Sequence, residues 1–336
     1  MTLLRRAVTV PVVTVLMLCV LLYAPPLMAL AVVADLVLRS SRPTRTVAAV
    51  VAYAALELRA LARLLRGDQD GDRFMRDFVG MIYTVARRVL DVEVLLDTDA
   101  IEPDAVPRGE PVLVLSRHCG PGDSLLVTWL LTFHYRLRTR IVLKGLLRCE
   151  PVLDLAGDLG HPDGSLCFLS RRGKRARAQI RELAASLGAG DALLLFPEGG
   201  NFTWARWREA IGRLRASGRL REARRAWRQS YTLPPRTGGA AAALAGAPQA
   251  NVLVVTHSGF SADGRARPWW RLPVHRRLVV HVTLVSAAEL PPREELGAWL
   301  RDVWSAVDAW VAEHIKSAAV TPVPSHAHKA PQESYL

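Results

Sequence analysis

The chain has 336 residues, half of them hydrophobic, which accommodates one large catalytic domain with an appended segment, and its formal net charge is +13. A basic chain suits nucleic acid or an anionic membrane, but the sequence has no nucleic-acid-binding motif and begins with apolar residues. We therefore expect membrane lipids with anionic headgroups, and no nucleic acid, as partners.

Two apolar stretches open the chain, residues 7–38 and residues 46–65. Each is long enough to reach across a bilayer, and the first is longer than the apolar core of a cleaved signal peptide, so we expect a retained anchor. Pro25 and Pro26 would either kink a single span or turn a re-entrant hairpin. Charges in the second stretch favour an interfacial helix instead. Residues 1–70 are thus predicted to form a membrane anchor of one or two hydrophobic helices.

Short apolar runs alternate with helical patterns through residues 71–316. This alternation predicts an α/β fold, a mixed central sheet with helices on its faces, preceded by the membrane-associated helices. A closing amphipathic helix is expected at 292–315, and the tail at 317–336 is expected to be disordered. The predicted strands are 92–96, 112–115, 140–143, 166–169, 192–196, 252–255 and 278–284.

The most informative motif follows the second predicted strand, where His118 and Asp123 stand five positions apart. Residues 120–122 are Gly-Pro-Gly and cannot lie inside a helix, so the strand must turn before an apolar helix at 124–133. The turn can fold the carboxylate back onto the imidazole, which leaves the other ring nitrogen as a proton acceptor. The alternative is an ordinary surface histidine followed by a helix-capping aspartate.

A later predicted strand ends in the sequence F-P-E-G-G at residues 196–200. With both motifs present, residues 90–290 resemble the glycerolipid acyltransferase family, whose members carry an H-x4-D block followed by F-P-E-G. Residues 168–171 resemble the second block of that family, and residues 252–255 resemble its last apolar strand. The run at 233–239 is similar to the Pro-Arg-x-x-Gly element of the lysophosphatidate and lysocardiolipin branch.

The resemblance implies a membrane-bound O-acyltransferase whose domain, residues 71–316, faces the cytoplasm at the cell membrane. It would move a fatty acyl group from acyl-CoA or acyl carrier protein to a hydroxyl of a lysophospholipid, 1-acylglycerol-3-phosphate or a related lipid. His118 would act as general base, and Asp123 would fix its tautomer and stabilise the imidazolium. Neither a metal nor a bound cofactor is expected.

Three alternatives to this chemistry stay open. Departures from the family pattern at Ser170, Gly200 and Thr256 suit a catalytically silent, lipid-binding module of the same fold. A lipid acyl hydrolase would use His118 to activate water instead of an acceptor hydroxyl. Cys119, next to the histidine, would allow a covalent acyl-enzyme.

An acceptor phosphate is expected to meet guanidinium groups and open backbone N–H groups, both of which match phosphate oxygens. Glu198 would hold an acceptor hydroxyl or an arginine. For each basic residue an ordinary surface charge is the alternative. The predicted substrate-binding residues are Arg171, Glu198, Gly199, Gly200, Arg236 and Lys144.

Between residues 204 and 228, nine arginines accompany only two glutamates. Trp204, Trp207, Ile211 and Leu214 recur at helical spacing, which predicts a basic amphipathic insertion at 204–229. Such a helix suits anionic lipid headgroups, and the alternative is a solvated basic helix whose Trp stripe packs on the core.

Overall fold

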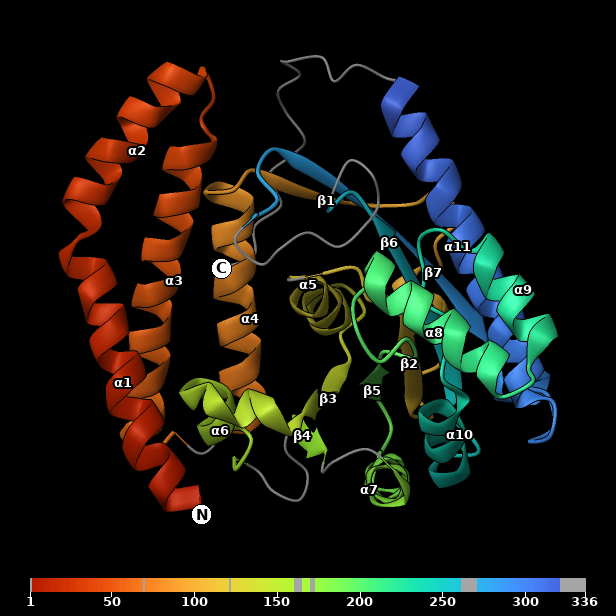
Figure 1. Cartoon of the computed structure of the whole chain (residues 1–336). Helices are drawn as coiled ribbons and strands as arrows, with labels where there is room; N and C mark the ends of the chain where they lie inside the picture. The colour runs from red at the N-terminus through yellow and green to blue at the C-terminus, as the bar shows by residue number, and fades with distance from the viewer. Residues whose placement is uncertain are drawn as a thin grey trace.

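The computed structural model describes residues 2–68, 70–120, 122–159, 165–169, 173–260 and 271–320. They contain a seven-stranded sheet with the order β1-β7-β6-β2-β5-β3-β4 (Figure 1). Neighbouring strands are parallel except β6 and β7, which are antiparallel, so the predicted mixed sheet is confirmed. All seven predicted strands are present: β1 (Val92–Leu96), β2 (Val112–Ser116), β3 (Arg138–Lys144), β4 (Leu166–Leu169), β5 (Asp191–Leu195), β6 (Asn251–Ser258) and β7 (Arg276–Val285).

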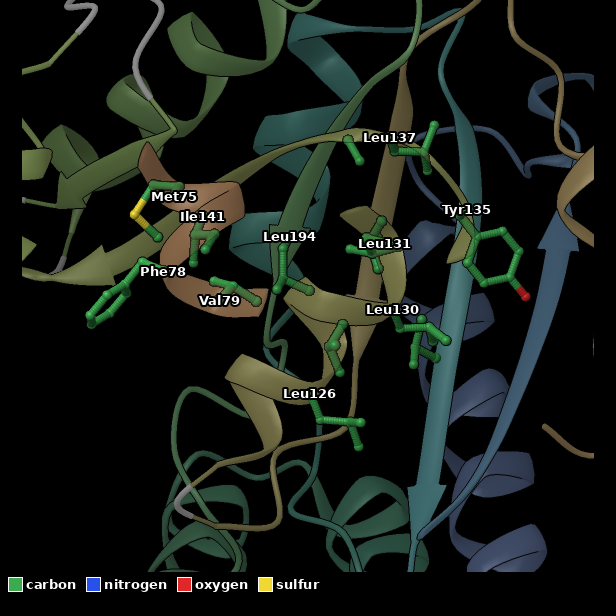
Figure 2. Close-up of a cluster of buried hydrophobic side chains, with 14 of the residues drawn as sticks. Met75, Phe78, Val79, Leu126, Leu130, Leu131, Tyr135, Leu137, Ile141 and Leu194 are labelled. Atoms are coloured by element: carbon green, nitrogen blue, oxygen red, sulfur yellow. The ribbon is translucent and has the colours of Figure 1, made fainter. Parts of the chain in front are cut away.

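Helices cover both faces of this sheet, which is why every residue of β2, β5 and β6 is buried. On one face, α4 (Gly71–Arg88) and α5 (Asp123–Trp129) pack on Val114 and Leu194. A π turn at Leu130–His134 continues α5. Figure 2 shows this cluster, with side chains of both helices beside Leu194. The other face carries α7 (Lys174–Ala185), α10 (Thr237–Gly246) and α11 (Leu296–Val320).

Three helices precede α4: α1 (Thr2–Leu22), α2 (Ala24–Leu38) and α3 (Arg42–Leu65). The break at Tyr23 lies directly before Pro25 and Pro26, which occupy the first turn of α2, where a proline costs no hydrogen bond. In the part of the chain that the structure describes, α1 alone is long and apolar enough to cross a membrane. The third helix runs beside α2 and buries a face that includes Ala54 and Leu61 (Figure 1).

Both ends of the α1–α2 segment contact the α/β part of the chain. At one end, Arg5 and Arg6 donate to the fully buried Asp154 carboxylate, with nitrogen–oxygen distances of 2.7 and 3.0 Å. Asp154 lies in α6 (Pro151–Ala156). Just past the other end, the Ser41 hydroxyl lies 2.6 Å from the His275 ring. Between these two contacts, α1 and α2 pack mainly on α3.

The predicted basic insertion is two helices, α8 (Trp204–Ala216) and α9 (Leu220–Arg228), because the chain turns at Gly218 with a φ of +74°. The side chains of Trp207, Ile211 and Leu214 are buried against α9, and the Trp207 indole N–H donates to the Gln229 carbonyl at 2.9 Å. These three side chains thus join the two helices in a cluster of their own, whereas the packing alternative placed the stripe on the core, and Trp204 is exposed.

The closing helix is present, but α11 begins four residues later than predicted and continues to Val320. Residues 317–320, placed in a disordered tail by the sequence pattern, are therefore helical, and the rest of the predicted tail lies outside the described residues. The helix contacts β6 and α10, and Trp304 and Val307 belong to the core on that face.

Candidate active site

The two sequence motifs meet at one edge of the sheet. Strands β3, β5, β2 and β6 are mutually parallel, so their carboxyl ends lie together. Lys144 ends β3, His118 follows β2 and Glu198 follows β5. In α/β sheets this edge is where ligands bind.

The turn after β2 brings the Asp123 carboxylate onto the imidazole. Gly122 adopts a φ of +95°, and α5 starts at the next residue. The His118 Nδ1 and Asp123 Oδ2 atoms are 2.9 Å apart. In this turn, Asp123 Oδ2 also accepts the Cys119 and Gly120 N–H groups at 2.6 and 2.9 Å. The other oxygen, Oδ1, accepts the Ser124 N–H in the first turn of α5 at 2.6 Å.

These contacts set the protonation of the pair. Burial alone would raise the pKa of the fully buried Asp123, but the hydrogen bond and charge of His118 outweigh it and hold that pKa below its ordinary value. An ionised carboxylate can only accept, so His118 Nδ1 carries a hydrogen and Nε2 is left as the acceptor. The ring is 21% exposed and lies against Phe196, with centroids 4.6 Å apart.

Glu198 connects the two motifs through the backbone. One carboxylate oxygen accepts the His118 N–H at 3.0 Å, and the other accepts the Leu233 N–H at 2.8 Å. Burial raises the pKa of this carboxyl to about 7, although both N–H donors act against the rise. Sequence reasoning gave Glu198 a contact with an acceptor hydroxyl or an arginine. In the structure its oxygens also position the His118 backbone and the loop that leads to Arg236.

Most of the predicted substrate-binding residues line one pocket of about 100 Å³. The Arg236 guanidinium covers Gly199, where a Cβ atom would lie 3.2 Å from Cζ and where φ is +69°. The pocket is lined by Lys144, Glu198, Gly199, Gly200, Arg236 and two arginines that the motifs did not single out, Arg206 and Arg213. Ser170 and the predicted site residue Arg171 lie outside the described residues.

Sequence reasoning also missed Arg117, whose side chain is fully buried. Its guanidinium donates to the carbonyl oxygens of His257 at 2.8 Å and of Tyr231 at 3.0 Å. Burial lowers the pKa of His257 to about 4, so this second histidine is neutral and cannot repel the Arg117 charge. The only signal in the sequence was an arginine directly before the motif histidine.

The loop that supplies the Tyr231 carbonyl is fastened by Asp308 on α11. Its carboxylate accepts the N–H groups of three successive residues, 230–232, and the Thr232 hydroxyl, at distances between 2.8 and 3.2 Å. The loop then continues to Leu233, which donates to Glu198. A helix distant in sequence therefore helps to determine the positions of His118 and Arg236.

Part of the chain matches a known protein family. The acyltransferase family model matches residues 99–258, which contain both motifs and β2 to β6. One similar solved structure is the 1-acyl-sn-glycerophosphate (LPA) acyltransferase PlsC from Thermotoga maritima, with 15% identity over 96% of this chain and all of that one, at a TM-score of 0.46. No curated protein matches the sequence. The expected family is confirmed: residues 99–258 form an acyltransferase domain, and the protein is an acyltransferase.

Proposed function

We propose that this acyltransferase moves a fatty acyl group from acyl-CoA or acyl carrier protein to a free hydroxyl of a lysophospholipid, 1-acylglycerol-3-phosphate or a close relative. The observation that carries the proposal is the 2.9 Å contact between His118 Nδ1 and the buried Asp123 carboxylate, because it leaves Nε2 on a partly exposed ring as the base. The adjoining basic pocket supports a phosphate-bearing acceptor.

In the reaction, His118 Nε2 takes the acceptor hydroxyl proton while the hydroxyl oxygen attacks the thioester carbonyl carbon. The imidazolium so formed is stabilised by the Asp123 carboxylate. When the tetrahedral intermediate collapses, the carbon–sulfur bond breaks and the imidazolium returns its proton to the thiolate. The products are the acylated lipid and a free thiol, and no other co-reactant is required.

The acceptor phosphate is assigned to the pocket between Lys144 and Arg236. The Arg236 guanidinium can present two parallel N–H groups to phosphate oxygens, and the Lys144 ammonium supplies a second positive charge. Gly199 and Gly200 let an anion approach the backbone. The proposed phosphate-binding role of Arg171 rests on its sequence motif alone.

The covalent route through Cys119 is the weaker mechanism. The thiol is buried, and that burial raises its pKa, so little thiolate is present near neutral pH. Its backbone N–H is also bonded to Asp123. Direct transfer to the acceptor needs no thiolate.

For the membrane, we propose that α1 and α2 lie along one leaflet and do not cross the bilayer. Since Arg5 and Ser41 both contact the α/β part of the chain, a crossing would place one of these contacts on the far side, about 30 Å away. The outer face of the two helices is apolar and suits lipid. It includes Leu4, Val8, Val12, Val15, Leu30, Val33 and Val37, all exposed. The active site would then face the cytoplasm at the cell membrane.

The test is to incubate membranes containing the protein with radiolabelled oleoyl-CoA, or with oleoyl acyl carrier protein, and a panel of lysophospholipids. Labelled phospholipid that forms with wild-type protein and is lost with His118→Ala supports the proposal. Release of free fatty acid without labelled phospholipid would mean a hydrolase. No product with either donor would indicate a silent lipid-binding module.

A second arm tests the phosphate assignment. Arg236→Ala should raise the KM for the lysophospholipid more than the KM for the thioester, because only the acceptor phosphate is assigned to Arg236. Equal rates on lysophospholipids and on phosphate-free monoacylglycerol would refute a phosphate-binding role for this pocket.

A further inference from the structure

A second and larger basic pocket lies beside the candidate active site. Its volume is about 310 Å³, and it is enclosed by the α8–α9 hairpin, the first turn of α10 and the side of α11. Figure 1 shows the hairpin lying against α11. Five arginines from separate parts of the chain line it: Arg213, Arg219, Arg225, Arg236 and Arg301.

The charges around this pocket are strongly unbalanced. Glu222 is the one carboxylate in its lining, and it lies 3.4 Å from Arg219 and 3.8 Å from Arg301, so it is shared between two guanidinium groups. Arg213 and Arg225 pair with Glu209 and Asp302, whose carboxylates stand outside the lining. Leaving Arg236 aside, the other four arginines share three carboxylates, so positive charge is in excess.

The two pockets are adjacent. Ala210, Arg213, Pro234 and Arg236 line both of them. Arg236 is also the residue before α10, whose first residues, Thr237 and Gly238, line the larger pocket and receive no side-chain cap. The positive end of that helix dipole therefore adds to the arginine charge.

The size and lining of the larger pocket indicate the kind of group that fits. Its volume is at the lower end for small-molecule sites, so it accommodates a headgroup and not an acyl chain. Its polar lining is supplied mainly by guanidinium forks, which match phosphate oxygens in pairs.

We infer that this pocket is a second phosphate subsite, distinct from the one that receives the acceptor phosphate next to Glu198. It takes a phosphate carried by one of the two substrates: a second phosphate on the acceptor headgroup or the 3′-phosphate of CoA. The inference deepens the proposed function and rests on it for the substrate sources. Arg213 and Arg236, shared by the two pockets, place the two phosphates on neighbouring subsites.

The first test does not depend on turnover. Calorimetric titration of the detergent-solubilised full-length protein with inorganic phosphate should show two equivalents bound to wild type and one to the Arg219→Gln/Arg301→Gln variant. Arg224→Gln, an exposed change on α9 outside the lining, is the matched control and should bind two. Equal stoichiometry in wild type and the double variant would overturn the subsite, whether or not the protein transfers acyl groups.

A variant that is expected to bind phosphate more tightly distinguishes loss of the subsite from misfolding. Glu222→Gln removes the one carboxylate of the lining and should tighten phosphate binding at this subsite about tenfold, a free-energy gain of about 1.4 kcal/mol. Unchanged or weaker binding in a variant with wild-type thermal unfolding contradicts the inference.

Kinetics then identify the source. If the phosphate belongs to CoA, the Arg219→Gln/Arg301→Gln variant should have a KM for oleoyl-CoA about tenfold higher than wild type. Its KM for oleoyl-dephospho-CoA, which lacks the 3′-phosphate, should be unchanged. If it belongs to the acceptor, the rise should appear with lysophosphatidylglycerol phosphate and not with lysophosphatidate. An active enzyme whose variant shows neither rise has no such subsite. An enzyme inactive with every substrate refutes the proposed function and leaves the titration to decide the subsite.

Discussion

Arg117 and His257 hold each other's backbone at the ends of two neighbouring strands. The Arg117 guanidinium donates to the His257 carbonyl at 2.8 Å, and the His257 Nε2 atom lies 3.1 Å from the Arg117 carbonyl. Both side chains are fully buried. Because Arg117 directly precedes His118, this reciprocal contact fixes the backbone from which the proposed base projects.

Arg117→Ala should therefore destabilise the protein. It leaves the buried carbonyls of Tyr231 and His257 without their guanidinium donor, and we expect the free energy of unfolding to fall by about 2 to 4 kcal/mol. Urea unfolding measures the change. Arg224→Ala, an exposed change, should stay within about 0.5 kcal/mol of wild type, and an Arg117→Ala protein that matches it would show that these contacts contribute nothing.

Asp123→Asn should slow turnover about 10²- to 10⁴-fold. The amide can donate to His118 Nδ1, which places the hydrogen on Nε2 and removes the proton acceptor. Steady-state acyl transfer from oleoyl-CoA gives the rate, with the exposed Asp104→Asn change as control. Activity of Asp123→Asn within a few-fold of that control would mean that the carboxylate does not set the tautomer.

Glu198 should make stability depend on pH. Its pKa rises from 4.5 to about 7 on folding, so the folded state holds this proton more tightly than the unfolded state does. The Glu198 contribution to the free energy of unfolding therefore falls as pH rises from about 4.5 to about 7, by at most about 3 kcal/mol. Below this window both states hold the proton, and above it neither does, so the contribution is constant on each side.

His257 opposes this trend, because its pKa falls to about 4 on folding and its contribution grows with pH between about 4 and 6.5. The effect of Glu198 is isolated by subtraction. The free energy of unfolding of wild type minus that of Glu198→Gln should decrease between pH 4.5 and pH 7. A difference that stays constant over that range means that Glu198 titrates normally in the fold.

Two glycine substitutions should have opposite effects. Gly199→Ala places a Cβ atom 3.2 Å from the Arg236 guanidinium at a φ of +69°, so it should cost about 1 to 2 kcal/mol and raise the acceptor KM. Gly212→Ala, in α8 with nothing within 4 Å of the new methyl, should raise stability by about 0.5 to 1 kcal/mol. Thermal unfolding and acceptor titration of both variants provide the comparison. Equal effects would rule out strain at Gly199.

The strands and the pairing of His118 with Asp123 were predictable because the sequence patterns that indicate them are local. Buried parallel strands are continuous apolar runs, as in β2 and β5, and Gly-Pro-Gly forces the turn that returns Asp123 to His118. The break between α8 and α9 was missed because Gly218 stands in a run of arginines and alanines that continues the helical pattern on both sides.

The contacts that hold the site in place could not be predicted, because they involve backbone groups. Arg117, Glu198 and Asp308 bind backbone groups, and their partners lie up to 140 positions away. A carbonyl or an N–H group has no signature in the sequence, so the partner of a buried charge appears only in the folded chain. In a sequence with so many arginines, one buried arginine does not stand out.

The pairing of Arg5 with Asp154 has a consequence for the order of synthesis. The two residues are separated by 149 positions, so α1 waits roughly 7 to 30 s after its own synthesis for this partner to be made. During that interval α1 can pack on α3, but its contacts with α6 are not yet formed. The proposed binding of α1 to the membrane can therefore precede the assembly of the domain.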